Sequence, residues 1–166
     1  MDNDIETLIS TMAQSLRALL QAQRIETACM VGIHTGGVWI AQRLHALLQL
    51  EQPLGNLDIS FYRDDFTRIG MNPQVQPSNL PFNVDDRHII LVDDVLHTGR
   101  TIRAALNELF DYGRPASIML AVLVERSGRE LPIQANVVGR HMDLSAQEHV
   151  KLTGPEPLAL TTTRNA

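Results

Sequence analysis

The stretch HIILVDDVLHTGRT, residues 88–101, decides the fold of this chain. Residues 88–92 carry the most apolar strand signal in the sequence, and two carboxylates, Asp93 and Asp94, follow that strand directly. Small and hydroxyl-bearing residues then lead into a segment with apolar residues at helical spacing. A buried strand that passes through a polar turn into a helix is typical of proteins built on a parallel sheet.

The same alternation extends in both directions from this stretch. Apolar residues at helical spacing predict helices, and short apolar or alternating runs predict strands. The predicted helices are residues 5–20, 38–48 and 102–110, and the predicted strands are residues 28–33, 57–62, 88–92, 117–124 and 135–138. Strands that are apolar on both faces indicate a single α/β domain over residues 1–166, with a mostly parallel sheet flanked by helices.

Two segments depart from this pattern. Residues 63–87 contain three prolines and little periodicity, and a connection of this length is usually functional, so we predict a flexible flap over a site. The tail, residues 142–166, is polar and divergent, and the sequence predicts no definite structure for it.

Composition excludes several classes of protein. Lysine and arginine number 14 against 19 acidic residues, a net charge of −5, so the chain is not a general polyanion binder. The sole lysine, Lys151, argues against Schiff-base chemistry, and the single cysteine excludes a disulfide framework. No apolar run is long enough to span a membrane and the first residues are acidic, so we expect a cytoplasmic protein.

The turn after residue 92 suits a phosphorylated sugar. Backbone N–H groups at the start of a helix favour an anion, and the hydroxyls of Thr98 and Thr101 add donors while Gly99 allows close approach of the main chain. The carboxylates of Asp93 and Asp94 suit sugar hydroxyls or a metal ion. A ribose 5-phosphate carries both kinds of group, separated by about one sugar ring.

Residues 92–101 resemble the phosphoribosyl-pyrophosphate (PRPP) signature of the type I phosphoribosyltransferases. Within that superfamily the chain is similar to the PyrR family, whose members regulate pyrimidine operons and are also uracil phosphoribosyltransferases. Further matching pieces occur in the expected order between residues 28 and 140: VGI (31–33), YRDD (62–65), GRP (113–115), LVER (123–126) and RELP (129–132).

The resemblance implies a reaction and a site. Uracil and PRPP would give UMP and pyrophosphate, with Mg²⁺ bound to the pyrophosphate and held indirectly by Asp93 and Asp94. These aspartates would stabilise charge at the anomeric carbon, and Arg63 would act on the leaving group. The implied PRPP- and nucleotide-binding residues are Thr35, Gly36, Gly37, Asp93, Asp94, Val95, Leu96, His97, Thr98, Gly99, Arg100, Thr101 and Arg126. A homodimer or a higher homo-oligomer is also expected.

Two departures from the family pattern leave alternatives open. The pyrophosphate loop reads Thr35-Gly36-Gly37 where the family commonly has Thr-Arg-Gly, which predicts weakened turnover. Binding to a leader mRNA would depend on a small patch made of Arg126, Arg129, Arg140 and His141. The alternative function is therefore a catalytically weak sensor that acts through RNA or protein binding. A salvage enzyme for another base, such as a purine, is disfavoured by the YRDD and RELP segments.

Overall fold

The structure is a computed structural model, and it describes residues 5–59 and 78–165. Helices and strands alternate through most of this length, as the sequence predicts. The elements in chain order are α1 (Ile5–Ala22), β1 (Ala28–Ile33), α2 (Gly36–Leu48), β2 (Gly55–Leu57), β3 (His88–Leu96), α4 (Arg100–Tyr112), β4 (Ser117–Arg126), β5 (Val137–Met142), β6 (Glu148–Thr153) and β7 (Ala159–Arg164).

Five of the strands form one parallel sheet in the order β2-β1-β3-β4-β5. Its centre is in register through Val31, Leu91 and Leu120, all of which are buried. The central strands read as continuous apolar runs because both faces of the sheet are covered. The predicted α/β fold, with a mostly parallel sheet flanked by helices, is confirmed.

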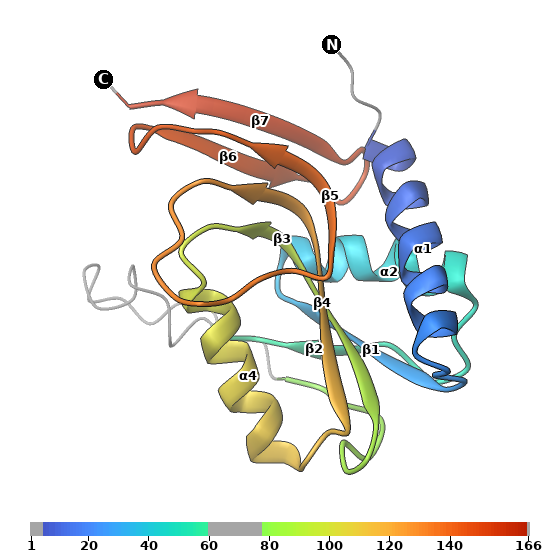
Figure 1. Cartoon of the computed structure of the whole chain (residues 1–166). Coiled ribbons are helices and arrows are strands. Elements are labelled where there is room, and N and C mark those ends of the chain that lie inside the picture. Colours follow the sequence, from blue (N-terminus) through green and yellow to red (C-terminus); the bar gives the residue numbers. More distant parts are fainter. Residues whose placement is uncertain (1–4, 60–77, 166) are drawn as a thin grey trace.

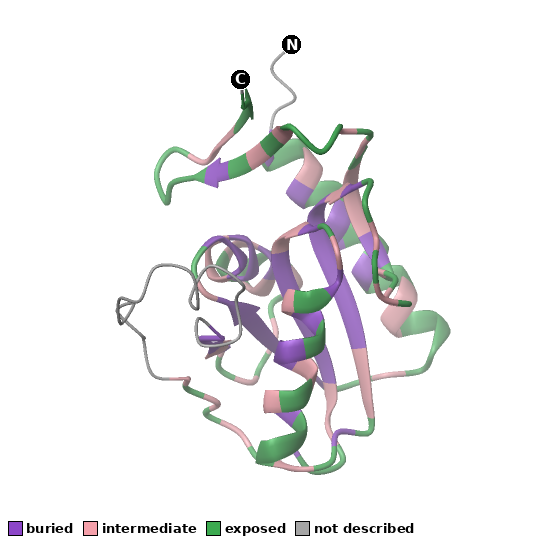
Figure 2. Ribbon diagram, turned by 90° about the vertical axis from the view of Figure 1, so that its left-hand side faces the viewer, coloured by how far each residue is buried: buried purple, intermediate pink, exposed green. Residues whose placement is uncertain are grey.

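Helices cover the two faces of the sheet unequally (Figure 1). Helices α1 and α2 pack on one face, where Leu16 and Leu44 meet Ile90 in a fully buried cluster. Helix α4 packs on the other face, where Leu109 meets Leu91 and Val122. Figure 2 shows the buried residues concentrated in the strands between these layers. Successive side chains of a strand point to opposite faces of the sheet, and here both faces are buried against helices. Burial of apolar side chains on both faces holds the sheet between the helices.

The tail folds into the antiparallel hairpin β6–β7, for which the sequence predicted no definite structure. Leu152 pairs with Leu160, and Leu152 is buried in the cluster that α1 and α2 form. The hairpin lies at the end of the molecule toward which β3 and β4 run (Figure 1).

The bounds of four strands differ from the predictions. Strand β4 extends to Arg126 rather than to residue 124, and β5 runs from Val137 to Met142 rather than over residues 135–138. Strand β3 extends to Leu96, so Asp93 and Asp94 lie within the strand, near its C-terminal end, rather than after it. The predicted strand over residues 57–62 is short in the described part, where β2 ends at Leu57. Residues 60–77, and with them most of the predicted flap and Arg63, lie outside the described residues. No helix in the described part of the chain is long and apolar enough to cross a membrane.

Candidate active site

Three connections gather at the carboxyl-end edge of the parallel sheet. They are the β1–α2 turn (residues 34–36), the 97–101 loop between β3 and α4, and the β4–β5 loop (residues 127–136). Because β1, β3 and β4 are neighbours and parallel, these connections are forced into proximity. Ligands of open α/β sheets bind at this edge.

The β1–α2 turn lies directly against the carboxylates of β3. The peptide bond between His34 and Thr35 is cis, and α2 begins at Gly36. A side chain at Gly36 would start 2.3 Å from Asp94 Oδ2, so only hydrogen fits between this turn and the carboxylate. A side chain at Gly37 would likewise start 2.6 Å from the carbonyl oxygen of Val92. The two glycines therefore allow the backbone of the turn to approach β3 closely.

Backbone N–H groups orient the paired aspartates. Asp93 is 3% exposed, and its Oδ1 accepts a 2.8 Å hydrogen bond from the N–H of Asp94. The Oδ1 of Asp94 accepts one of the same length from the N–H of Val95. Both carboxylates lie near the start of α2, with Oδ2 of Asp94 against Gly36 and Oδ1 of Asp93 near Gly37. Leu96, which the resemblance places among the nucleotide-binding residues, is buried in the cluster beneath α4.

The 97–101 loop presents the N-terminus of α4. Gly99 has φ 97°, a conformation that favours glycine, and its carbonyl accepts the N–H of Arg103 in the first turn of the helix. The hydroxyl of Thr98 accepts the N–H of Arg100 at 3.2 Å. A helix start with a basic side chain beside it is suited to an anion. The guanidinium of Arg100 is half-exposed and pairs with Glu130 at 3.0 Å.

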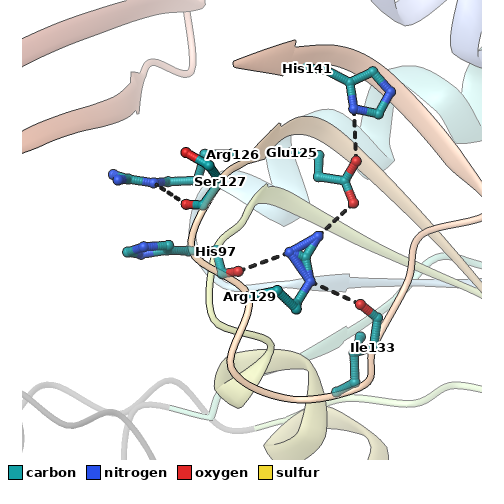
Figure 3. Close-up of polar contacts among 7 residues, drawn as sticks. All are labelled: His97, Glu125, Arg126, Ser127, Arg129, Ile133 and His141. Atoms are coloured by element: carbon teal, nitrogen blue, oxygen red, sulfur yellow. Dashed lines mark hydrogen bonds and ion pairs between the residues drawn. The ribbon is translucent and has the colours of Figure 1, made fainter. Parts of the chain in front are cut away.

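A cavity of about 420 Å³ opens beside this loop, between the ends of β4 and β5. It is lined by Glu125, Arg126, Ser127, Gly128, Arg129, His141, Met142 and Asp143. The carboxylate of Glu125 accepts hydrogen bonds on both oxygens, from Arg129 at 2.5 Å and from His141 at 2.7 Å (Figure 3). An ion pair between Glu125 and Arg129 thus lies among the lining residues of the cavity.

Arg126, expected at the rim of a base pocket, is 5% exposed and anchors the tail. Its guanidinium donates to the carbonyl oxygens of Ser145 at 3.0 Å and Glu148 at 2.7 Å, and its Nε donates to that of Ser127. The hydroxyl of Ser127 adds a donated and an accepted bond with the backbone of Leu144. The end of β4 therefore holds the segment that leads into the hairpin.

The surroundings of His97, in the 97–101 loop, disfavour the charged form of its ring. Partial burial lowers the pKa of His97 from its ordinary value, and the positive charge of Arg126 lowers it further. Its ring lies against the β4–β5 loop, since a side chain at Gly128 would start 2.8 Å from Nε2.

The described residues by themselves do not form a metal cage at this site. Among the described residues, no group of three or more His, Cys, Asp or Glu side chains could hold a metal ion. Two adjacent carboxylates, however, fit a magnesium ion whose other ligands are substrate phosphates and water, which is the usual arrangement for this ion.

The family model for the phosphoribosyl transferase domain matches residues 3–154. The chain belongs to the phosphoribosyltransferase family. Its relatives include the bifunctional protein PyrR of Nitrosococcus oceani, 64% identical over 93% of this chain and 89% of that protein. The PyrR protein of Pseudomonas aeruginosa PAO1 is 59% identical over 92% of this chain and 90% of its own length. Membership of the PyrR group, predicted from the YRDD and RELP segments, is confirmed.

Solved structures agree on the fold of this phosphoribosyltransferase. A hypoxanthine phosphoribosyl transferase of Trypanosoma cruzi aligns with a TM-score of 0.65 at 20% identity, covering 85% of this chain and 75% of that one. A hypoxanthine-guanine phosphoribosyltransferase of Bacillus anthracis aligns with a TM-score of 0.66 at 15% identity, covering 86% and 81%. At these identities the likeness concerns the fold alone.

Sequence reasoning missed the roles of three residues at this edge. It assigned Glu125 no function, and it placed Arg129 and His141 in a possible RNA-binding patch. The structure brings all three into one cluster around the Glu125 carboxylate. The spacing of Glu125 and Arg129, four residues apart, was the only local signal, because His141 arrives from the neighbouring strand β5.

Proposed function

We propose that this protein transfers the phosphoribosyl group of PRPP to uracil, forming UMP and pyrophosphate, and regulates pyrimidine biosynthesis genes. One observation carries the catalytic half of the proposal. The paired carboxylates of Asp93 and Asp94 face the glycine turn at Gly36 and stand one loop away from the anion-binding start of α4. A ribose with phosphate at one end and pyrophosphate at the other matches these three features.

The reaction breaks the bond between the anomeric carbon and pyrophosphate, whose oxygen keeps the electron pair. A bond then forms from that carbon to the uracil nitrogen, which loses its proton. Asp93 and Asp94 bind the ribose hydroxyls and offset the positive charge that develops on the sugar. Thr35, Gly36 and Gly37 face the pyrophosphate, and Arg63, on sequence grounds alone, adds positive charge toward it.

The remaining parts of the substrate fit the other two connections. Thr98, Gly99, Arg100 and Thr101 surround the 5-phosphate with backbone and side-chain donors. The base lies near Val95, His97 and the cavity beside the β4–β5 loop, which Arg126 also lines. Asp93 and Asp94, together with the pyrophosphate, would hold a Mg²⁺ ion, which would supply positive charge to the leaving group.

The regulatory half rests on the relatives, which are named bifunctional PyrR proteins. A leader mRNA is the proposed target, with UMP or PRPP as effector. The expected basic patch is weaker than its composition indicates, because Arg129 and His141 already pair with Glu125 and Arg126 is buried. This favours an RNA contact that uses other residues in addition to Arg140. We place the protein in the cytoplasm, where its charged substrates are retained, as a homo-oligomer.

The alternative, a sensor with little turnover, is favoured by a specific feature of the β1–α2 turn. Gly36 leaves that turn without the guanidinium that the family commonly aims at pyrophosphate. Such a protein would bind PRPP and UMP at the same residues but release pyrophosphate slowly.

The deciding experiment measures UMP formation from uracil and PRPP with Mg²⁺, beside the Asp93→Asn, Asp94→Asn double variant. Turnover that the double substitution abolishes, and that a chelator removes, supports the enzyme. Binding of PRPP or UMP without turnover would favour the sensor. Absence of binding to either ligand would refute the site itself. A leader-RNA binding assay with and without UMP tests the regulatory half separately.

A further inference from the structure

Arg129 supplies a side-chain link between the β4–β5 loop and the 97–101 loop, beside the backbone bonds of Glu130 and Leu131 and the Arg100–Glu130 ion pair. Each of its three guanidinium nitrogens donates to a different segment (Figure 3). Nη1 donates to the carbonyl oxygen of His97 at 3.0 Å, Nη2 to the carboxylate of Glu125, and Nε to the carbonyl oxygen of Ile133 at 2.9 Å. Because the guanidinium is a rigid, planar fork, three partners fix both the distance and the orientation between the two loops and β4.

The anchor of this fork belongs to the sheet. Glu125 lies in β4 and pairs in register with Leu96, the last residue of β3 and the one before His97. Its second carboxylate oxygen is held by His141 on β5. The position of the Arg129 guanidinium is therefore fixed relative to the strand from which the 97–101 loop departs.

Two carbonyls of the 97–101 loop point toward the β4–β5 loop. That of His97 accepts from Arg129, and that of Thr98 accepts the backbone N–H groups of Glu130 and Leu131 at 3.0 and 3.1 Å. In a trans peptide unit the C=O and the following N–H point in opposite directions. The N–H groups of Thr98 and Gly99 are therefore turned away from the β4–β5 loop, and the proposed function places the phosphate on that side.

We propose that Arg129 is a positioning residue for the phosphate of the substrate. By holding the His97 carbonyl against the sheet, it aims the donors of the 97–101 loop at a phosphate monoester that it does not itself touch. The inference rests on the proposed function, because that function places the 5-phosphate at this loop. According to this inference, Arg129 affects the part of the nucleotide affinity that comes from the phosphate and leaves the part that comes from the base unchanged.

The test compares the affinities of UMP and uridine, which differ only in the phosphate, by calorimetry. The variant is Arg129→Gln, which removes the charge and the fork. Arg43→Gln is the matched control. Arg43 is exposed to a similar extent (21% against 25% of the side chain) and likewise binds a carboxylate, Glu6, and two carbonyls, but between α1, α2 and the tail. It differs in having a second, longer ion pair, with Glu156 at 3.8 Å.

In Arg129→Gln we expect the preference for UMP over uridine to fall by about tenfold or more, the usual effect of losing a supporting contact behind a binding group. Arg43→Gln should keep the preference of the wild-type protein even where its melting temperature falls. Arg129→Lys keeps the charge and reaches fewer acceptors, so its preference should be intermediate. It also serves as the test variant if Arg129→Gln does not fold.

Two results would overturn the inference, and they differ. An unchanged preference for UMP in folded Arg129→Gln and Arg129→Lys would reduce Arg129 to a structural contact and leave the proposed function intact. A wild-type protein that binds UMP no better than uridine would remove the phosphate from the 97–101 loop. The proposed function would then fail together with the inference.

Discussion

The carboxylate of Asp94 occupies the space that a side chain at Gly36 would need, because a Cβ there would lie 2.3 Å from Oδ2 and 2.8 Å from Cγ. The missing arginine of the family pattern is thus tied to the position of a residue proposed to bind ribose. Gly36→Ala should force Asp94 to move and lower the rate of UMP formation by about 10–100-fold. Gly36→Arg should not raise the rate. Steady-state assays on variants with an unchanged melting temperature would check this, and full activity in Gly36→Ala would contradict it.

His97 should titrate below its ordinary pKa of about 6.5, because burial and Arg126 both disfavour its charged form. Near pH 6.5 the unfolded chain therefore binds a proton at His97 more readily than the folded chain does. The contribution of His97 to stability is present above pH 6.5. It is lost as the pH falls through 6.5 toward the lowered pKa.

An NMR titration, assigned with His97→Gln, measures this pKa directly. Arg126→Gln should raise it by removing a nearby positive charge, and bound UMP should raise it by adding a negative one. A pKa at or above the ordinary value in the free protein would refute the proposed environment.

Arg126 should contribute strongly to stability, since its buried guanidinium satisfies carbonyls of Ser127, Ser145 and Glu148. Arg126→Gln is expected to lower the free energy of unfolding by about 2–4 kcal/mol, because buried acceptors lose a charged donor. Arg100→Gln is the comparison, because its pair with Glu130 is half-exposed and should matter by less than about 1 kcal/mol. Urea denaturation gives both values, and equal losses would show that Arg126 is not the anchor of the tail.

Leu152 should tie the hairpin to the core of the chain. It is 4% exposed and packs with the cluster that α1 and α2 form. Leu152→Ala should cost about 2–5 kcal/mol of unfolding free energy, as expected for a buried leucine. Leu47→Ala, at a position 44% exposed, should cost far less. If the hairpin contributed nothing to stability, Leu152→Ala and Leu47→Ala would lose similar amounts of unfolding free energy in thermal and urea denaturation.

Local patterns were sufficient to predict the sheet and its helices. The run from Ile89 to Val92 is apolar at every position, which is typical of a strand covered on both faces, and the paired aspartates mark the edge where ligands bind. The stripe of α4 and the glycine at its C-terminal end, Gly113, likewise carry their own signals.

The parts that local patterns could not predict depend on contacts between distant residues. Arg126 binds backbone carbonyls 19 and 22 residues away. Because every residue has a backbone carbonyl, the sequence does not show which ones a side chain will bind. The hairpin β6–β7 alternates weakly, because only Leu152 of its first strand is fully buried. In the sequence, Arg129 looks like an ordinary surface arginine. Only the folded structure shows that it shares the carboxylate of Glu125 with His141, which lies on the neighbouring strand β5.

The burial of Leu152 also has a consequence for synthesis on the ribosome. The layer between the sheet and α4 draws on residues up to Val138, so it can close while the hairpin is still unmade. The opposite layer, which contains the N-terminal helix, needs Leu152 and Leu160 to be complete. Because the hairpin follows the other members of this layer in the chain, the apolar surface that Leu152 covers stays exposed until the hairpin has been synthesised.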